Sequence, residues 1–350
     1  MIKQPRVIIH LAKLAHNFQT IAFRAARAGI KITGVLKGTA GDPEIARTLI
    51  EAGLLSIGDS RIENLAQLRN YPNLERMMVR LPAKSRLSEV FATATCSLNA
   101  EVEILQGLND VAEEKHQVFL MVDLGDLREG VAPVDLMELG RFCRKLRRLA
   151  VVGLGTNFSC FAGVIPTVSK LKQLIQLAEE LQSEAQLPIQ YISGGNSSSL
   201  ALLYQGTIPR GINHLRIGEG ILAGKETLSG GSLPDLYQDA FILEAEVIQS
   251  QWKPARPEGK IGLDAFGRVP QLTEVPDGIR LLLNIGHQDT PLTGLKPLDP
   301  EVTVLGGSSD YLVAAGSQKH KVGQTLSFIP NYWSILGLMT SPYVSRTYIQ

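Results

Sequence analysis

Cysteine is scarce in this sequence. Only three of the 350 residues are cysteines, namely Cys96, Cys143 and Cys160, and no two of them form a CxxC pair. An odd number of widely spaced cysteines excludes a disulfide framework and a sulfur-based zinc site. The pattern is typical of a protein of the reducing cytoplasm, and we expect no bound metal.

An excess of charge and long apolar runs are missing as well. Lysine and arginine number 35 against 34 acidic residues, a net charge of +1, so no field would attract nucleic acid or an anionic membrane. The N-terminal run RVIIHL is too short for a secretion signal, and nothing later approaches the ~18 apolar residues of a membrane span. A hydrophobic content of 44% indicates a soluble globular protein.

Short β-rich runs alternate with amphipathic helical stretches, such as PEIARTLIEAG, through the first two thirds of the chain. Alternating βα units imply a parallel sheet, and eight of them match an α/β fold of the (β/α)8 barrel type. A doubly wound sheet is the alternative, but no GxGxxG turn follows the first run. The predicted strands cover residues 31–37, 54–59, 76–81, 94–99, 117–123, 151–157, 189–194 and 214–219.

The helical periodicity fades beyond about residue 235. Proline and glycine turns separate the β-rich runs that follow. We therefore predict a barrel over residues 1–234 and a smaller β-rich C-terminal domain over residues 235–350. The strands predicted in that domain cover residues 240–252, 279–287, 301–307, 310–315 and 324–329.

Polar residues gather at the predicted strand ends, where barrel enzymes carry their catalytic groups. Lys37 follows the apolar run ITGVL, and desolvation there would lower the pKa of its amine and make it nucleophilic. The segments SGGNSSSL and RIGEGI, at the seventh and eighth strands, offer hydroxyl and backbone N–H groups to a phosphate. The alternatives are a surface lysine and a functionless turn. Together the features predict a phosphate-bearing aldehyde cofactor.

Several segments resemble the alanine racemase family, and the resemblance extends over essentially the whole chain. They include GVLKGTAGDPEIA, DSRIENL, MVDLGDLREG, SGGNSSSL and GLDAFG, in the family's order. The resemblance implies pyridoxal 5'-phosphate as the cofactor, racemisation by two bases on opposite faces of it, and a head-to-tail homodimer with shared active sites. The expected partner is a small amino acid, and neither nucleic acid nor a membrane is expected.

The resemblance also implies roles for single residues. Lys37 matches the lysine that binds the cofactor covalently and moves the Cα proton on one face. Arg216 matches the arginine facing the pyridine nitrogen, which would keep that nitrogen unprotonated. Asn157 stands where the family places a histidine behind this arginine. The residues matched to phosphate contacts are Ser197, Gly218, Glu219 and, with fewer matching neighbours, Tyr332.

Two further matches concern the substrate and the second base. Arg128 matches the arginine that supports the cofactor phenolate and the substrate carboxylate, and a loop ion pair with Asp126 or Glu129 is the alternative. Asp264 is the expected opposite-face base, because GLDAFG replaces the family's GYADG and contains no tyrosine. A carboxyl with an ordinary pKa of ~3.9 is a poor proton donor. A turn-forming aspartate is the alternative.

These departures from the family pattern argue against alanine as the substrate. We expect ornithine, whose terminal ammonium needs an acidic partner; Asp310, Asp289 and Glu219 are candidates, and Asp310 is preferred. Alanine or another amino acid is the alternative substrate. A non-catalytic pyridoxal-phosphate carrier would resemble the barrel alone, and a decarboxylase is expected to use a cysteine in the C-terminal domain, where this chain has none. A dehydratase would need a metal site.

Overall fold

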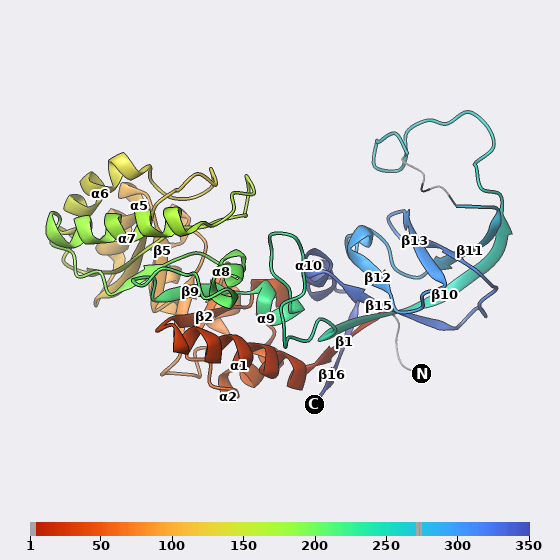
Figure 1. Cartoon of the computed structure of the whole chain (residues 1–350), viewed down its shortest axis with the longest axis horizontal. Helices are drawn as coiled ribbons and strands as arrows, with labels where there is room; N and C mark the ends of the chain where they lie inside the picture. The colour runs from red at the N-terminus through yellow and green to blue at the C-terminus, as the bar shows by residue number, and fades with distance from the viewer. Residues whose placement is uncertain (1–4, 271–272, 274) are drawn as a thin grey trace. The chain divides into compact units, whose positions relative to one another are not determined.

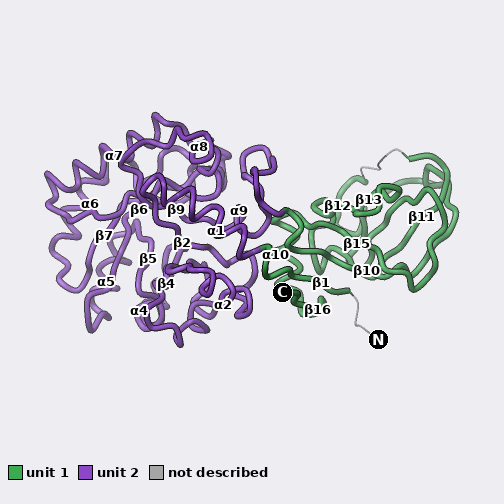
Figure 2. The backbone as a smooth tube through the Cα atoms, turned by 60° about the horizontal axis from the view of Figure 1, so that its bottom comes forward, with its two compact units in different colours: residues 1–13, 238–350 green, residues 14–237 purple. Residues whose placement is uncertain are grey.

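The computed structural model of the chain describes residues 5–270, 273 and 275–350. The backbone separates into two compact units (Figure 2). One comprises Leu14–Tyr237, and the other combines Met1–Lys13 with Gln238–Gln350.

The unit Leu14–Tyr237 is a closed barrel of eight parallel strands, so the predicted barrel is confirmed (Figure 1). Its strands are β2 (Lys31–Val35), β3 (Ser56–Asp59), β4 (Glu75–Met78), β5 (Cys96–Asn99), β6 (His116–Met121), β7 (Leu149–Gly155), β8 (Tyr191–Ser193) and β9 (His214–Ile217). The helices are α1 (Leu11–Arg27), α2 (Pro43–Glu51), α3 (Ile62–Ala66), α4 (Leu87–Thr93), α5 (Val102–Val111), α6 (Leu136–Cys143), α7 (Val168–Ser183), α8 (Leu200–Tyr204) and α9 (Glu219–Ala223). Short 3₁₀ turns are η1 (Lys37–Thr39), η2 (Lys84–Arg86), η3 (Pro133–Asp135) and η4 (Ser197–Ser199).

Local sequence determines where helices of the barrel begin. Asp42 precedes α2 and accepts the backbone N–H groups of Glu44 and Ile45 at 3.1 and 3.2 Å, with Pro43 at the first helical position. Thr167 caps α7 in the same way through the N–H of Lys170. Such caps satisfy donors that the first turn of a helix leaves unpaired.

The barrel interior is partly apolar and partly polar. Met77, Phe119 and Met121 belong to a buried apolar cluster. The ring of Phe119 on β6 lies 5.4 Å from that of His214 on β9, and these strands are not neighbours in the barrel, so both side chains point inward. Buried polar groups such as His214 must find hydrogen-bond partners within the barrel.

The second unit is built around a β-rich sheet, which confirms a separate β-rich domain. Its strand order is β12-β15-β10-β11-β14-β13, with β1 paired to β10 and to β16. The strands are β1 (Arg6–His10), β10 (Phe241–Lys253), β11 (Gly278–Leu283), β12 (Leu295–Pro297), β13 (Val302–Gly307), β14 (Leu312–Gly316), β15 (Thr325–Pro330) and β16 (Ser345–Ile349). The unit also contains η5 (Leu292–Gly294) and α10 (Tyr332–Thr340).

The unit boundaries differ from the predicted division at residue 234. Strand β1 belongs to the β-rich unit, because Val7 pairs with Leu243 on β10 and with Arg346 on β16. At the other end, the backbone N–H of Tyr237 donates to Asn17 Oδ1 at 2.8 Å, which ties residues 235–237 to the barrel unit. Because β1 pairs with strands more than 200 residues away in the sequence, no local pattern could assign it to the β-rich unit.

Within the described residues of the β-rich unit, three strands and two helical elements were not predicted: β1, β12, β16, η5 and α10. The three strands are short, and α10 follows directly on β15, with Asn331 as its capping residue. Among the described residues, none of the helices has the length and apolar character needed to span a bilayer.

Candidate active site

Lys37 opens η1 immediately after β2, at the carboxyl end of the barrel strands. The neighbouring residues Leu36, Gly38 and Thr39 are buried, whereas Lys37 is exposed. Thr39 Oγ1 donates to the carbonyl oxygen of Leu36 at 2.9 Å. The turn is therefore anchored through its backbone and presents the lysine at the barrel mouth.

Asp59 ends the next strand, β3, and its carboxyl group is buried. Burial raises the pKa of Asp59 to about 6, while hydrogen bonds from Arg61 N and Asn64 Nδ2 and the charge of Lys37 oppose that increase. Lys37 follows β2 and Asp59 ends the neighbouring strand β3, so both residues lie at adjacent strand ends of the mouth.

Ser197 begins η4 after β8 and is buried. Its Oγ accepts the backbone N–H groups of Gly218 and Gly220 at 3.2 and 3.1 Å, which joins the segments after β8 and β9 as the phosphate prediction requires. A hydroxyl that accepts two N–H groups directs its own proton elsewhere, so Ser197 can donate to an anion. Gly220 was not among the predicted contacts, and the N–H of Glu219 has no such bond to Ser197 Oγ.

Arg216 on β9 is buried, with 3% of its surface exposed. Its Nη2 donates to the carbonyl oxygen of Thr156 at 2.7 Å and to Asn157 Oδ1 at 2.9 Å, and its Nη1 donates to Ser193 Oγ. Burial lowers the pKa of Arg216 to about 10, against the opposing charge of Glu129. The guanidinium therefore stays charged at neutral pH, and its acceptors within the described part of the chain are uncharged.

Asn157 and Glu129 connect Arg216 to Arg128. Asn157 Nδ2 donates to Glu129 Oε1, and Arg128 forms an ion pair with the same carboxylate. The side chain of Glu129 is only 14% exposed, against 36% for Arg128. The ion pair anticipated as an alternative for Arg128 is present, and it orients the guanidinium at the mouth.

The loops that carry these residues are held by buried Asp126. Its Oδ2 accepts the N–H groups of Cys160 and Phe161 at 2.9 and 3.1 Å, and its Oδ1 accepts that of Val164 at 3.2 Å. The loop after β7 is thereby tied to the loop after β6, which includes Arg128. A carboxylate with several backbone donors makes such a connection rigid.

Glu219 and Tyr332 take less defined positions. Glu219 is half-buried at the start of α9, and burial raises the pKa of its carboxyl group. Tyr332 is half-buried at the first position of α10 in the β-rich unit. Their predicted phosphate contacts stay predictions.

Asp264 lies in an exposed turn of the β-rich unit. Its Oδ1 accepts the N–H groups of Phe266 and Arg268, both at 2.8 Å, and its Oδ2 accepts Arg268 Nε at 3.2 Å. These hydrogen bonds, above all that from the Arg268 N–H, and the charge of Arg268 lower the pKa of the carboxyl group. These contacts are typical of a turn-forming aspartate. Because a lowered pKa leaves the carboxyl group deprotonated at neutral pH, it disfavours the step in which the predicted second base must donate a proton.

The acidic candidates for a substrate ammonium also differ in environment. Asp310 is exposed, and its two oxygens accept Gln288 Nε2 at 3.2 Å and Ser309 Oγ at 3.0 Å. Asp289 is buried and accepts Ser341 Oγ at 2.8 Å, which is a structural contact. Of these two, only Asp310 is accessible to a ligand.

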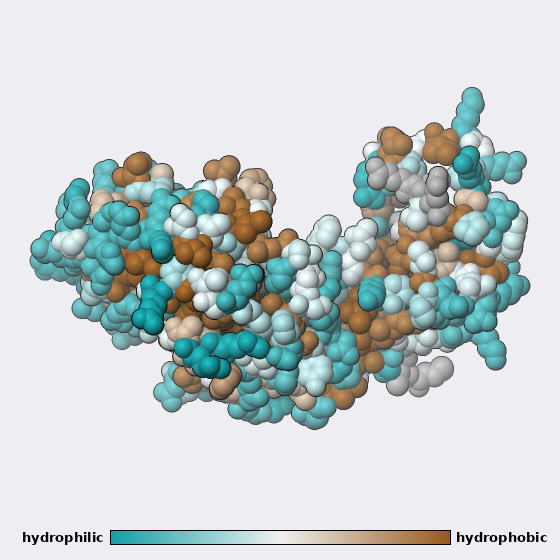
Figure 3. Space-filling model, in the orientation of Figure 1, coloured by the Kyte–Doolittle hydropathy of each residue, from teal (hydrophilic) through white to brown (hydrophobic). Residues whose placement is uncertain are grey.

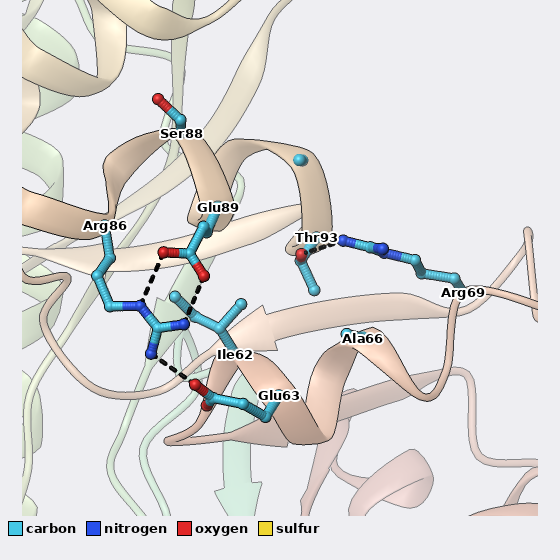
Figure 4. A pocket seen from close by; sticks show the side chains of 9 residues that line it. Ile62, Glu63, Ala66, Arg69, Arg86, Ser88, Glu89 and Thr93 are labelled. Atoms are coloured by element: carbon cyan, nitrogen blue, oxygen red, sulfur yellow. Dashed lines mark hydrogen bonds and ion pairs between the residues drawn. The ribbon is translucent and has the colours of Figure 1, made fainter.

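A separate pocket of about 350 Å³ lies on the outer side of the barrel between α3 and α4 (Figure 4). Arg86 spans it, bonded to Glu63 and Glu89 at 2.6 and 2.5 Å. The charge of Arg86 is thus paired within the pocket, whereas Arg69 donates to Thr93 Oγ1 at 2.7 Å. None of the predicted site residues lines the pocket.

Sequence reasoning missed the contacts by which Glu129 orients Arg128 and Asp126 joins the loops at the mouth. Both stand in the quoted segment MVDLGDLREG, but only as alternatives to a role for Arg128. The repeated acidic residues around a single arginine were the available signal, since a loop needs internal acceptors to hold an arginine in place.

Comparison with known proteins points to the same family as the residues at the barrel mouth. A family model described as the alanine racemase N-terminal domain matches residues 9–225. The chain is 35% identical over 349 residues to the ornithine racemase of Acetoanaerobium sticklandii, covering 98% of this chain and 99% of the relative. It is 37% identical over 351 residues to the lysine racemase of Thermotoga maritima, covering 98% of each.

Solved structures agree with the fold. The alanine racemase of Streptomyces lavendulae superposes with a TM-score of 0.74 at 18% identity, over 100% of this chain and 98% of that one. Because the family model spans the barrel and the two relatives extend over nearly the whole chain, this protein belongs to the alanine racemase family.

Proposed function

We propose that this protein racemises a basic amino acid, with ornithine as the substrate. This proposal rests on the similarity over 98% of the chain to two relatives named ornithine racemase and lysine racemase. Both names denote amino acids with a terminal amine. As a member of its family, the protein is an isomerase that uses pyridoxal phosphate.

The residues of the barrel mouth fit that cofactor. Lys37 supplies an exposed primary amine, and Ser197, whose Oγ accepts the N–H groups of Gly218 and Gly220, has its own hydroxyl proton left to donate to a phosphate. A phosphate bound by neutral donors agrees with the near-zero net charge of the chain. Pyridoxal phosphate, when bound, withdraws electrons from the substrate Cα and acidifies its proton.

The remaining steps belong to side chains. Lys37 takes the Cα proton on one face or returns it. Arg128, oriented by Glu129, pairs with the substrate carboxylate, since guanidinium and carboxylate match in geometry. Arg216, charged and buried, would face the ring nitrogen and leave it unprotonated. Asp264 is the proposed acceptor on the opposite face, and its carboxylate also accepts the N–H groups of Phe266 and Arg268.

Asp310 is the proposed partner of the substrate's terminal ammonium. It is exposed, and the side chains that donate to its carboxylate in the described part of the chain are the neutral Gln288 and Ser309, so its charge is available for a cation. Asp310→Asn should therefore raise KM for ornithine more than KM for alanine.

The test is a screen of single L-amino acids in deuterated water, with exchange of the Cα proton as the readout. We expect ornithine to exchange fastest and lysine next, and Lys37→Ala to abolish exchange together with the visible absorption of the bound cofactor. A cofactor-saturated wild-type protein that exchanges no amino acid would instead indicate a pyridoxal-phosphate carrier. Fastest exchange of alanine would overturn the substrate assignment.

We also propose a homodimer. Large apolar side chains on the mouth loops are exposed, including Leu127 at 71%, Phe161 at 75% and Ile165 at 57%, and hydrophobic patches are visible on the surface (Figure 3). Apolar side chains on such loops favour association. Sedimentation should give about twice the 38.1 kDa chain mass.

The free cysteines agree with the proposed location in the cytoplasm.

A further inference from the structure

A chain of side-chain hydrogen bonds leads from Arg216 into the barrel. Ser193 Oγ on β8 is bonded to Arg216 Nη1 and, at 2.7 Å, to Nδ1 of His214. On the other side of its ring, His214 Nε2 is 2.9 Å from Thr33 Oγ1 on β2. His214, Ser193 and Thr33 are all buried, with 0–1% of their surface exposed.

The chain continues to a carboxylate. Thr33 Oγ1 is 2.7 Å from Ser56 Oγ on β3, and Ser56 Oγ donates to Glu75 Oε1 at 2.8 Å. Glu75, at the start of β4, also accepts Lys31 Nζ at 3.0 Å. The hydrogen bonds therefore link a buried cation at the mouth to an anion at the opposite ends of the strands.

The two ends determine the direction of every bond between them. A carboxylate only accepts, so Ser56 gives its proton to Glu75 and accepts from Thr33, and Thr33 accepts in turn from His214 Nε2. In a neutral ring Nδ1 is then the acceptor, so Ser193, which accepts from Arg216, donates to it. All the dipoles are aligned from Arg216 to Glu75.

The aligned hydrogen bonds stabilise the buried charge of Arg216. Among the described residues, the hydrogen-bond acceptors of Arg216 are Ser193, Thr156 and Asn157, and none is charged. A buried guanidinium without a carboxylate contact is costly, and aligned hydrogen bonds reinforce one another in a medium of low dielectric constant. Burial and the charge of Arg216 lower the pKa of His214, so its ring is neutral as the chain requires.

We propose that His214 is a positioning residue for Arg216: as the Nε2–H tautomer it polarises Ser193 toward the guanidinium and holds Arg216 in its orientation. The role of Arg216 toward the cofactor rests on the proposed function. The hydrogen-bond chain itself does not, because it consists of residues of this protein alone.

The barrel contains a matched control. His116 is also buried and forms a hydrogen bond to a serine, Ser97, with its Nε2 at 2.9 Å from Ser97 Oγ. Burial lowers the pKa of His116 to about 4. This pair lies on β5 and β6 and has no hydrogen bond to Arg216. His116→Phe thus removes a comparable buried imidazole without breaking the chain.

The first experiment is long-range ¹H–¹⁵N NMR of the histidine rings in the holoenzyme at neutral pH, with the His214 signals assigned by their loss in His214→Phe. We expect a neutral ring protonated on Nε2. An Nδ1–H tautomer or a doubly protonated ring would overturn the proposal. This readout does not require racemase activity, so it stands apart from any failure of the proposed function.

The second experiment compares His214→Phe, Thr33→Val and His116→Phe. Thr33→Val is nearly isosteric and breaks the chain two bonds away from Arg216. We expect kcat to fall about 10-fold in His214→Phe and about 3-fold in Thr33→Val, with an altered absorption spectrum of the bound cofactor in both, because supporting residues of a site have effects of this order. His116→Phe should keep the wild-type spectrum. Equal spectral changes in both histidine variants, or none in Thr33→Val, would contradict the proposal.

Discussion

Asp59 makes the stability of the barrel depend on pH. Its folded-state pKa of about 6 lies above the ordinary value of 3.8, so the folded state binds the proton more tightly than the unfolded state. The resulting stability is fully present below pH 3.8 and is lost as the pH rises through about 6.

Asp59→Asn should remove this dependence, because an amide cannot titrate yet its oxygen still accepts from Arg61 N and Asn64 Nδ2. Between pH 7 and pH 5 the wild type should gain about 1 kcal/mol relative to the variant. Urea unfolding at the two pH values measures the difference. An unchanged difference would show that Asp59 has an ordinary pKa.

Asp264→Asn separates the two roles considered for this residue. The asparagine oxygen can still accept the N–H groups of Phe266 and Arg268, so the turn should survive. If Asp264 accepts the Cα proton on the opposite face, an amide there should lower kcat for racemisation by about 10²–10⁴-fold, the range that general acid–base catalysis contributes. A fall of less than about 10-fold would instead limit Asp264 to its turn role, in agreement with the contacts that lower the pKa of its carboxyl group.

At the scale of the element, the loop after β6 depends on a glycine. Gly130 has φ +123°, and a Cβ there would lie 2.5 Å from the backbone nitrogen of Asp123. Backbone atoms cannot yield as a flexible side chain can, so Gly130→Ala should cost more than ~2 kcal/mol of unfolding free energy. It should also lower kcat, because Arg128 and Glu129 directly precede this position.

Gly163→Ala, in the loop after β7, is the matched control. Gly163 also has a positive φ, +72°, but no atom lies within 4 Å of its ideal Cβ. Its cost should be only the ~1 kcal/mol of a left-handed conformation. Chemical denaturation of the two variants measures both values, and equal costs would rule out the close approach at Gly130.

At the scale of the whole molecule, β1 contributes to the β-rich unit although it precedes the barrel in sequence. Ile9 is fully buried and pairs with Phe241 on β10 and Tyr348 on β16. Ile9→Ala should cost about 2–5 kcal/mol. Hydrogen exchange should show lost protection in β10 and β16 and unchanged protection in β3 to β8. Lost protection confined to the barrel would contradict this assignment.

The sequence alone was sufficient to predict the eight barrel strands, the separate β-rich domain and the family. Strand and helix periodicities are local, and each barrel strand pairs with neighbours one βα unit away, so the order of elements already implies the topology. The places of Lys37, Ser197 and Arg216 at the carboxyl ends of barrel strands could be predicted for the same reason, whereas their roles toward a cofactor stay predictions.

Only the tertiary structure could decide the partners of those residues. The ion pair of Glu129 with Arg128, the placement of β1 beside β10 and β16, and the hydrogen-bond chain from Arg216 to Glu75 join residues on different elements. The turn contacts of Asp264 depend on a loop conformation that composition does not specify. Such contacts follow from distances and directions between side chains, which exist only once the chain has folded.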